Sequence, residues 1–277
     1  MASVLPCWLR VRSHAVILDR FRVDGRVAIV TGAGKGIGAG SALALAEAGA
    51  DVVCAARTKE DIESTAGEAR RLGRRALAVP TDVNERDQLE NLVRTAADEF
   101  GRIDILVNNA GGWLPREAMR TSERSFEEAF HFNVTTAFLL TRFCAPLLAE
   151  SGAGAIVNIS SRAGSMVQPG FAAYGTAKAA LSFLTRNLAS EFAPKVRVNA
   201  IEVGSVATSA LDYVADNQEI RDQMIANTPM ARLGEVDDIA ACVLYLASPA
   251  ASWVTGKVFE VDGGIEHPQL TIPTAPL

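Results

Sequence analysis

The chain has 277 residues, 49% of them hydrophobic and 21% charged, with 27 Lys/Arg against 32 Asp/Glu and a net charge of −5. This composition is typical of a soluble globular protein, and the acidic balance excludes the basic surface of a nucleic-acid binder. No apolar run approaches ~18 residues, so we expect no membrane-spanning helix. The four cysteines are scattered and the three histidines are unpaired. We therefore expect neither disulfides nor a metal site, and a cytoplasmic location.

The two ends of the chain differ in composition from the middle. Residues 1–22 are rich in arginine and poor in acids. We interpret them as an N-terminal extension outside the core, with an organellar transit peptide as the alternative. Residues 267–277 contain three prolines, which exclude a helix interior or a central strand. We expect this tail to follow the surface or to reach a neighbouring subunit, which leaves 23–266 as one domain.

Between the ends, short apolar runs alternate with helical segments. The predicted strands cover 26–31, 51–55, 76–80, 103–107, 155–160, 196–201 and 258–261. The predicted helices cover 36–48, 59–72, 85–100, 122–151 (one helix or two), 172–192 and 237–247. The strand runs are largely continuous in apolar residues rather than alternating, as expected where helices cover both faces of a parallel sheet. This alternation predicts an α/β fold: a single Rossmann-type, doubly wound parallel sheet of about seven strands with helices on both faces.

A glycine-rich loop joins the first predicted strand to the first helix. The segment 31–38 reads Thr-Gly-Ala-Gly-Lys-Gly-Ile-Gly. Glycines at such a junction allow a tight turn and close approach of the backbone to a pyrophosphate, and the helix N-terminus attracts the anion. The loop predicts a dinucleotide site, with these candidate contacts: Gly32, Lys35, Gly36, Ile37 and Gly38.

The end of the second predicted strand indicates which dinucleotide would bind. An acid there would select NAD, but the strand ends Cys54-Ala55-Ala56-Arg57. A guanidinium at this place can pair with a 2′-phosphate, and Lys35 adds a second positive charge. The pattern favours NADP(H), with NAD(H) as the alternative if Arg57 and Lys35 are only solvated surface charges.

Further polar residues cluster at one edge of the predicted sheet. Tyr174 and Lys178 are four residues apart at the start of a predicted helix and therefore share a face. A neighbouring ammonium favours the phenolate, so Tyr174 could exchange a proton near neutral pH. Ser161 ends the fifth predicted strand and 108–111 (Asn-Asn-Ala-Gly) ends the fourth, while Asn133 lies in the helix that follows. Ligands bind at this edge in open α/β sheets.

Taken together, these motifs resemble the classical branch of the short-chain dehydrogenase/reductase family. The resemblance covers about 18–267. It implies a hydride transfer with Tyr174 as general acid/base, Lys178 as its modulator and ribose ligand, Ser161 as the residue that orients the substrate oxygen, and Asn133 as the holder of a relay water. The cofactor residues that it implies beyond the glycine loop and Arg57 are Asp82, Val83, Asn109, Ala110, Gly111, Val206 and Thr208, together with Tyr174 and Lys178.

Within this family the chain is most similar to bacterial 7α-hydroxysteroid dehydrogenases, on stretches such as 109–112, 197–199 and 248–254. One departure concerns the sixth strand. The family has Pro-Gly after this strand, and here the sequence is Glu202-Val203-Gly204. The loss of proline's fixed φ predicts a differently shaped or less rigid loop beside the nicotinamide.

The segment 209–229 is predicted to cover a substrate pocket. Its apolar residues are Leu211, Tyr213, Val214, Ile220, Met224 and Ile225, and Trp113, Met166 and Phe171 could add further walls. The pocket favours a bulky hydrophobic secondary alcohol or ketone of the steroid or terpenoid kind. The alternative is that these side chains are core or interface residues.

Two alternatives stay open. One is a 3-oxoacyl-(carrier protein or coenzyme A) reductase, which would need a basic docking surface where the sequence has Glu127 and Glu128. The other is a non-catalytic NADP(H)-sensing protein, which would not need the catalytic set. The family habit implies a homotetramer or homodimer through the helices over 122–151 and 172–192.

Overall fold

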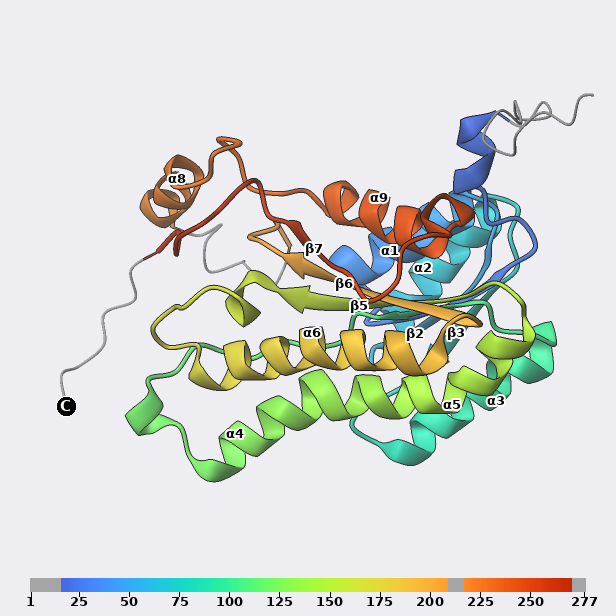
Figure 1. Cartoon of the computed structure of the whole chain (residues 1–277), viewed down its shortest axis with the longest axis horizontal. Coiled ribbons are helices and arrows are strands. Elements are labelled where there is room, and N and C mark those ends of the chain that lie inside the picture. Colours follow the sequence, from blue (N-terminus) through green and yellow to red (C-terminus); the bar gives the residue numbers. More distant parts are fainter. Residues whose placement is uncertain (1–15, 209–216, 271–277) are drawn as a thin grey trace, which may run out of the picture.

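The computed structural model describes residues 16–208 and 217–270, and in them seven parallel strands form one sheet in the order β3-β2-β1-β4-β5-β6-β7 (Figure 1). The strands are β1 (Val27–Thr31), β2 (Asp51–Ala56), β3 (Ala76–Pro80), β4 (Ile105–Asn108), β5 (Gly154–Ser161), β6 (Val196–Val203) and β7 (Val258–Val261). The order reverses between β1 and β4, and such a switch point opens a crevice at the carboxyl ends of the strands. The predicted doubly wound sheet is confirmed.

Helices cover both faces of the sheet (Figure 1). One face carries α1 (Gly36–Glu47), α2 (Lys59–Arg71) and α9 (Val236–Ala247). The other carries α3 (Arg86–Phe100), α5 (Thr136–Glu150) and α6 (Ala172–Phe192), with α4 (Glu123–Phe130) packed on α6. A short helix that the sequence analysis did not predict, α8 (Gln218–Ala226), lies beyond the strand ends.

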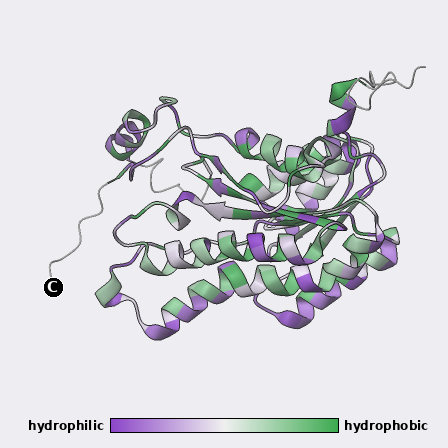
Figure 2. Ribbon diagram, in the orientation of Figure 1, coloured by the Kyte–Doolittle hydropathy of each residue, from purple (hydrophilic) through white to green (hydrophobic). Residues whose placement is uncertain are grey.

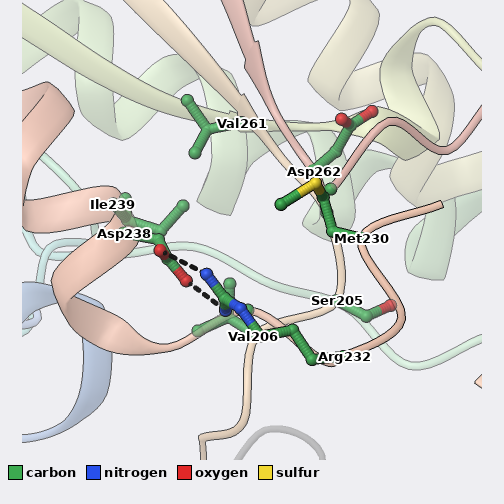
Figure 3. A pocket seen from close by; sticks show the side chains of 11 residues that line it. Ser205, Val206, Met230, Arg232, Asp238, Ile239, Val261 and Asp262 are labelled. Carbon is green, nitrogen blue, oxygen red and sulfur yellow. Dashed lines mark hydrogen bonds and ion pairs between the residues drawn. The ribbon is translucent and has the colours of Figure 1, made fainter. Parts of the chain in front are cut away.

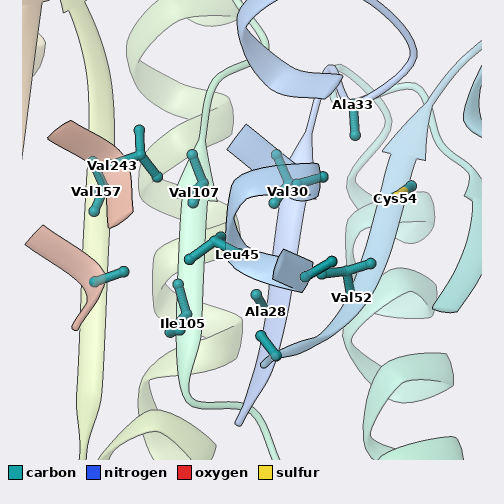
Figure 4. Packing of buried hydrophobic residues seen from close by; sticks show 14 of the residues in the cluster. Ala28, Val30, Ala33, Leu45, Val52, Cys54, Ile105, Val107, Val157 and Val243 are labelled. Atoms are coloured by element: carbon teal, nitrogen blue, oxygen red, sulfur yellow. The ribbon is translucent and has the colours of Figure 1, made fainter. Parts of the chain in front are cut away.

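Alternate strand residues build two hydrophobic layers. Ala28 and Val30 of β1 pack toward Leu45 of α1 and Val243 of α9 (Figure 4). Their neighbours Val27 and Ile29 belong to the opposite layer, together with apolar residues of α3, α5 and α6. The ribbon coloured by hydropathy shows the sheet and the inner helix faces as the apolar part of the molecule (Figure 2). Because both faces are buried, all five residues of β1 are buried, which explains the unbroken apolar run.

The predicted helix over 122–151 consists of α4, a π-helical turn (His131–Thr135) and α5. Within the described residues, the stretch Glu123–Glu150 is the one helix long and apolar enough in composition to cross a membrane. Its inner side chains, among them Leu140, Cys144 and Leu148, are buried in the layer against β4 and β5. This packing is that of a core helix.

At the N-terminal side, the 3₁₀ turn Ile17–Phe21 lies on the surface rather than in the core. Arg20 Nη2 donates to the carbonyl of Pro249 at 2.8 Å, and the ring of Phe21 lies 6.2 Å from that of Tyr245. The first core residue is Val23. The division into an extension of 1–22, a domain of 23–266 and a tail of 267–277 stays a prediction.

Candidate functional site

A cavity of about 790 Å³ opens at the carboxyl ends of the strands. The ends of β1, β2, β4, β5 and β6 reach it, so residues far apart in sequence meet there. Its lining includes all fifteen predicted cofactor residues as well as Ser161. Asn133 is the one predicted catalytic residue that does not line the cavity, and it lies behind Gly111 and Gly112.

The glycine loop is closed against the end of β4. Asn109 Nδ2 donates to the carbonyl of Thr31 at 2.9 Å. A Cβ at Gly38 would lie 2.2 Å from the carbonyl oxygen of Gly32 and 2.5 Å from Asn109 Nδ2, and Gly32 itself has a φ of +66°. No side chain fits at either glycine, so the backbone itself forms this wall of the cavity.

This loop fits a pyrophosphate. The helix α1 begins directly at Gly36, and its N-cap residue, Lys35, makes no side-chain hydrogen bond to the first turn. The N–H groups of the first turn and the positive end of the helix dipole therefore face the cavity. Gly36 also stands close to Thr208: a Cβ there would lie 3.2 Å from Thr208 Cγ2. The loop after β6 thus meets the glycine loop, and Val206 in it pairs with Gly234 in an isolated bridge.

At the end of β2, Arg57 is exposed and lines the cavity. Lys35 lies across from Asp61, with Nζ 3.3 Å from Oδ2. Asp61 and Thr58 line the cavity as well, and neither was predicted from the sequence. Asp82, after β3, accepts hydrogen bonds at Oδ1 from both the backbone and the side-chain nitrogen of Asn84 at 3.0 Å.

Ser161 and Tyr174 face each other across the cavity's inner end. Ser161 is the last residue of β5, and its Oγ accepts the backbone N–H of Ala163 at 3.2 Å. Burial raises the pKa of the Tyr174 phenol, and a hydrogen bond with Ser161 works in the opposite direction. The expectation that Lys178, together with a bound cationic nicotinamide, favours the phenolate concerns the cofactor complex and stays a prediction.

Lys178 is buried beside Tyr174. Its Nζ lies 5.7 Å from the centroid of the Tyr174 ring and donates to the carbonyl of Ile159 at 2.9 Å. Burial lowers the pKa of this ammonium to about 7, because the charged form loses its hydration. The helical i, i+4 spacing therefore does place both groups on one face of α6, as predicted.

Asn133 belongs to the π-helical turn between α4 and α5. Its Oδ1 accepts the N–H of Gly112 at 2.8 Å, and its Nδ2 donates to the carbonyl of Ala129 at 2.9 Å. Such single π turns are frequent at functional sites because they redirect one residue. Asn133 thereby fixes the segment that follows β4.

The substrate end of the cavity is largely apolar. Trp113, Met166, Phe171 and Met224 line it as predicted, whereas Ile220 and Ile225 do not. Leu211, Tyr213 and Val214 lie outside the described residues. Of the tail 267–277, predicted for the surface or a neighbouring subunit, His267 is exposed, whereas Gln269 and Leu270 line the cavity and the residues from 271 on lie outside the described ones.

The residue that holds this part of the tail at the cavity is Gln269, which is buried. Gln269 accepts a hydrogen bond from Ser205 Oγ at 2.5 Å, and its Nε2 donates to the carbonyl of Met224 at 3.2 Å. It therefore ties the loop after β6 to α8. A glutamine between prolines and apolar residues carries no periodic signal that would have indicated this contact.

Glu202, which precedes Val203 at the departure from the family pattern, belongs to a buried ionic cluster next to Ser161. Glu202 accepts hydrogen bonds from Ser165 Oγ at 2.6 Å and from Ser182 Oγ at 2.8 Å. Arg162 Nε lies 2.8 Å from Asp262 Oδ2, and its Nη1 lies 3.6 Å from Glu202 Oε2. The cation of Arg162 thus joins the ends of β5, β6 and β7.

A second, smaller cavity of about 200 Å³ borders the loop after β6 from its other side (Figure 3). It is lined by Ser205, Val206, Met230 and Asp262, with Arg232 Nη1 2.7 Å from Asp238 Oδ2 at its edge. Among the described residues, no group of three His, Cys, Asp or Glu side chains is arranged to hold a metal ion.

Comparison with known proteins agrees with this geometry. A family model described as Enoyl-(Acyl carrier protein) reductase matches residues 32–266. A 7α-hydroxysteroid dehydrogenase of Escherichia coli K12 is 39% identical over 89% of this chain and 96% of its own length. The chain belongs to the short-chain dehydrogenase/reductase family. As a member of this family it is an oxidoreductase that uses a nicotinamide cofactor on CH–OH groups, which sets aside a non-catalytic sensor.

Other short-chain dehydrogenase/reductases are similar over nearly the whole chain. An uncharacterized oxidoreductase of Mycobacterium tuberculosis is 49% identical over 93% of this chain and 98% of its own. A 3-oxoacyl-(acyl-carrier-protein) reductase of Thermotoga maritima is 33% identical over 88% of this chain and 99% of its own. A solved 7α-hydroxysteroid dehydrogenase in complex with NADH and 7-oxo glycochenodeoxycholic acid has a TM-score of 0.87 at 38% identity, covering 91% of this chain and 99% of that one.

Proposed function

We propose that this short-chain dehydrogenase/reductase interconverts a bulky hydrophobic, steroid-like secondary alcohol and its ketone with NADP(H). The observation that carries the proposal is the convergence of Ser161, Tyr174 and Lys178 on one cavity that also contains the glycine loop. An apolar end of that cavity, with Trp113 and Phe171 in its lining, supports a bulky ring system as the substrate.

The reaction needs a proton donor at the substrate oxygen. The nicotinamide, when bound, exchanges a hydride with the carbonyl carbon. Tyr174 gives its phenolic proton to the carbonyl oxygen in the reducing direction and takes it back in the oxidising direction. Ser161 donates a hydrogen bond to the same oxygen, which stabilises the developing alkoxide because this donor is already positioned on the end of β5.

The other two members of the catalytic set support Tyr174. Lys178, fixed to β5 through the carbonyl of Ile159, holds the nicotinamide ribose and supplies the proton that Tyr174 has given away. Asn133 holds a water that links Lys178 to the solvent. The hydrogen bond from the N–H of Gly112 keeps the Asn133 side chain in position for this role. With a pKa of about 7, Lys178 can exchange this proton near neutral pH.

The remaining cofactor residues would each contact a different part of the dinucleotide, according to their position in the cavity. The pyrophosphate would lie on the backbone of Gly32, Gly36, Ile37 and Gly38; the adenine by Asp82 and Val83; and the nicotinamide side by Asn109, Ala110, Gly111, Val206 and Thr208. Arg57 and Lys35 would pair with the 2′-phosphate, which is our reason for preferring NADP(H) over NAD(H).

A 3-oxoacyl thioester reductase is the second candidate, supported by the family description and by the Thermotoga relative. A carrier protein is acidic and would dock on cations. On α4, Arg124 is instead engaged by Glu128, with Nε 2.7 Å from Oε1, and Glu127 stands beside it. This local neutralisation favours the steroid-like substrate.

The test follows reduced nicotinamide absorbance with a 7-oxo steroid, an acetoacetyl thioester and a small aliphatic ketone, each with NADPH and NADH. We expect the steroid ketone with NADPH to react fastest. Tyr174→Phe should lose roughly 10²- to 10⁴-fold in kcat while it still binds NADPH. A fast thioester with an inert steroid would replace the proposal by the second candidate, and near-normal turnover of Tyr174→Phe would refute the assigned chemistry.

We also propose that the enzyme is a cytoplasmic homotetramer, with a homodimer as the alternative. The support lies in α4, α5 and α6, whose outer sides expose large apolar rings: Phe126, Phe130, Phe138 and Phe183. Apolar clusters of this kind on a helix surface mark sites of protein association.

A further inference from the structure

Asp61 stands at the end of the cavity where β2 and the glycine loop meet. Its Oδ2 is 3.3 Å from Lys35 Nζ, and its side chain is 28% exposed, compared with 66% for that of Lys35. A Cβ at Gly34 would lie 2.9 Å from Asp61 Cβ, so this side chain lies directly against the loop. Of the residues that line this end of the cavity, Asp61 carries the negative charge nearest to Lys35.

The position of Asp61 matters because the 2′-phosphate is strongly anionic. Arg57, Lys35 and Asp61 together carry a net charge of +1. A phosphate monoester carries a charge of about −1.5 to −2 near neutral pH, so it attracts the two cations and repels the carboxylate. A ribose 2′-hydroxyl is uncharged and is not repelled. The same carboxylate also pairs with Lys35 and thereby offsets part of the positive charge that Lys35 offers to a phosphate.

We propose that Asp61 is a specificity-determining residue that limits the preference for a 2′-phosphorylated cofactor. It does so by neutralising Lys35 and by repelling the phosphate. This inference rests on the proposed binding of the 2′-phosphate by Arg57 and Lys35. It predicts that the enzyme accepts both NADP(H) and NAD(H), with a modest preference for NADP(H). Removing the charge of the Asp61 carboxylate should strengthen that preference.

The experiment measures binding of 2′,5′-ADP and of 5′-AMP to the full-length protein by calorimetry. These two probes differ only in the 2′-phosphate and do not depend on catalysis. Asp61→Asn should bind 2′,5′-ADP about two- to five-fold more tightly, the size expected for an exposed charge interaction, and 5′-AMP unchanged. The gain should shrink in about 1 M salt, because the Debye length there is only about 3 Å.

Two further variants make the result interpretable. Glu90→Gln is the matched control, because Glu90 is a half-exposed carboxylate paired with Arg86 at 2.9 Å on α3, outside the cavity lining. It should leave both affinities unchanged. In Lys35→Met, the added change Asp61→Asn should give a smaller gain, since part of the effect acts through Lys35.

The outcomes separate this inference from the proposed function. If Asp61→Asn weakens 2′,5′-ADP, leaves it unchanged, or shifts both probes equally, the role of Asp61 is refuted. If Lys35→Met and Arg57→Met leave the discrimination between the two probes unchanged, the proposed 2′-phosphate site is refuted as well. Weaker 2′,5′-ADP binding in those two variants, with no effect of Asp61→Asn, refutes only the present inference.

Discussion

Gly111 leaves no room for a side chain between Asn133 and Lys178. A Cβ on Gly111 would lie 2.7 Å from Asn133 Oδ1 and 3.0 Å from Lys178 Nζ. Because Gly111, in the segment after β4, has no side chain, the Asn133 amide and the Lys178 ammonium can approach the same point of the backbone. This glycine is required by the geometry of the catalytic set rather than by a turn.

The variant Gly111→Ala should displace Asn133, Lys178 or both. Because a misplacement of about 1 Å can cost about 10²-fold in rate, we expect kcat to fall by one to two orders of magnitude. Binding of 5′-AMP, at the other end of the cavity, should change little. The control is Gly67→Ala on α2, where nothing lies within 4 Å of the added methyl. It should keep full activity and gain roughly 0.4–1 kcal/mol of stability. Equal activity of both variants would contradict the tight fit.

The burial of Lys178 predicts how stability depends on pH. Its pKa is about 7 in the folded protein, well below the ordinary value of ~10.4 for lysine. Above about pH 7 the unfolded chain binds a proton that the folded chain releases, so the free energy of unfolding rises with pH. The slope is at most about 1.4 kcal/mol per pH unit.

Urea denaturation of the cofactor-free protein at about pH 7 and pH 8 measures this slope. The buried cysteines act in the opposite direction, because their thiols begin to ionise near pH ~8.5 in the unfolded chain and stay protonated in the folded one, so the slope is read as the difference between wild type and a Lys178 variant. Lys178→Met should reduce the dependence of the free energy of unfolding on pH. It should also raise stability at pH 7, since it removes a buried group that loses hydration. An unchanged slope in this variant would show that Lys178 keeps its ordinary pKa.

Much of the fold was predictable because the strands are buried on both faces. β1 and the first half of β5 appear in the sequence as apolar runs, and the helices α1 and α3 have a small-residue and an amphipathic pattern respectively. The helix α8 was not predicted, because of its nine residues Met224 alone is buried. A short, mostly exposed helix has no apolar stripe to detect.

The site was predictable to the extent that it depends on strand ends. Ser161 follows from the rule that ligands bind at the carboxyl edge of the sheet, and Tyr174 and Lys178 follow from their spacing of four residues on one helix. The contacts of Asp61 and Gln269 were not predictable, since they depend on which loops approach one another in three dimensions. The effect of burial on the pKa of the Tyr174 phenol was not predictable, because burial cannot be estimated from a spacing of four residues.

The cluster around Arg162 predicts a large effect on stability. Arg162→Met would leave Glu202 and Asp262 buried without their cation, and such a change costs about 3–5 kcal/mol. Replacing Glu202 by leucine in the same chain should recover part of this loss, because one of the two buried charges disappears. Urea denaturation measures both variants. Arg86→Met is the control, since its exposed pair with Glu90 is worth at most about 1 kcal/mol. A loss no larger than in this control would show that the cluster is solvated.

The exposed ring of Phe183 tests the proposed assembly. Its side chain is 61% exposed on α6, which packs against α4, where Phe126 and Phe130 are also partly exposed. A charge placed in an apolar interface must be desolvated, so Phe183→Glu should shift the sedimentation of the protein toward the monomer. Leu72→Glu is the matched control, because Leu72 is 45% exposed at the end of α2, on the other side of the sheet. If wild type and Phe183→Glu sediment alike while both fold normally, α6 is not the contact surface, and the rings on α4 to α6 need another explanation.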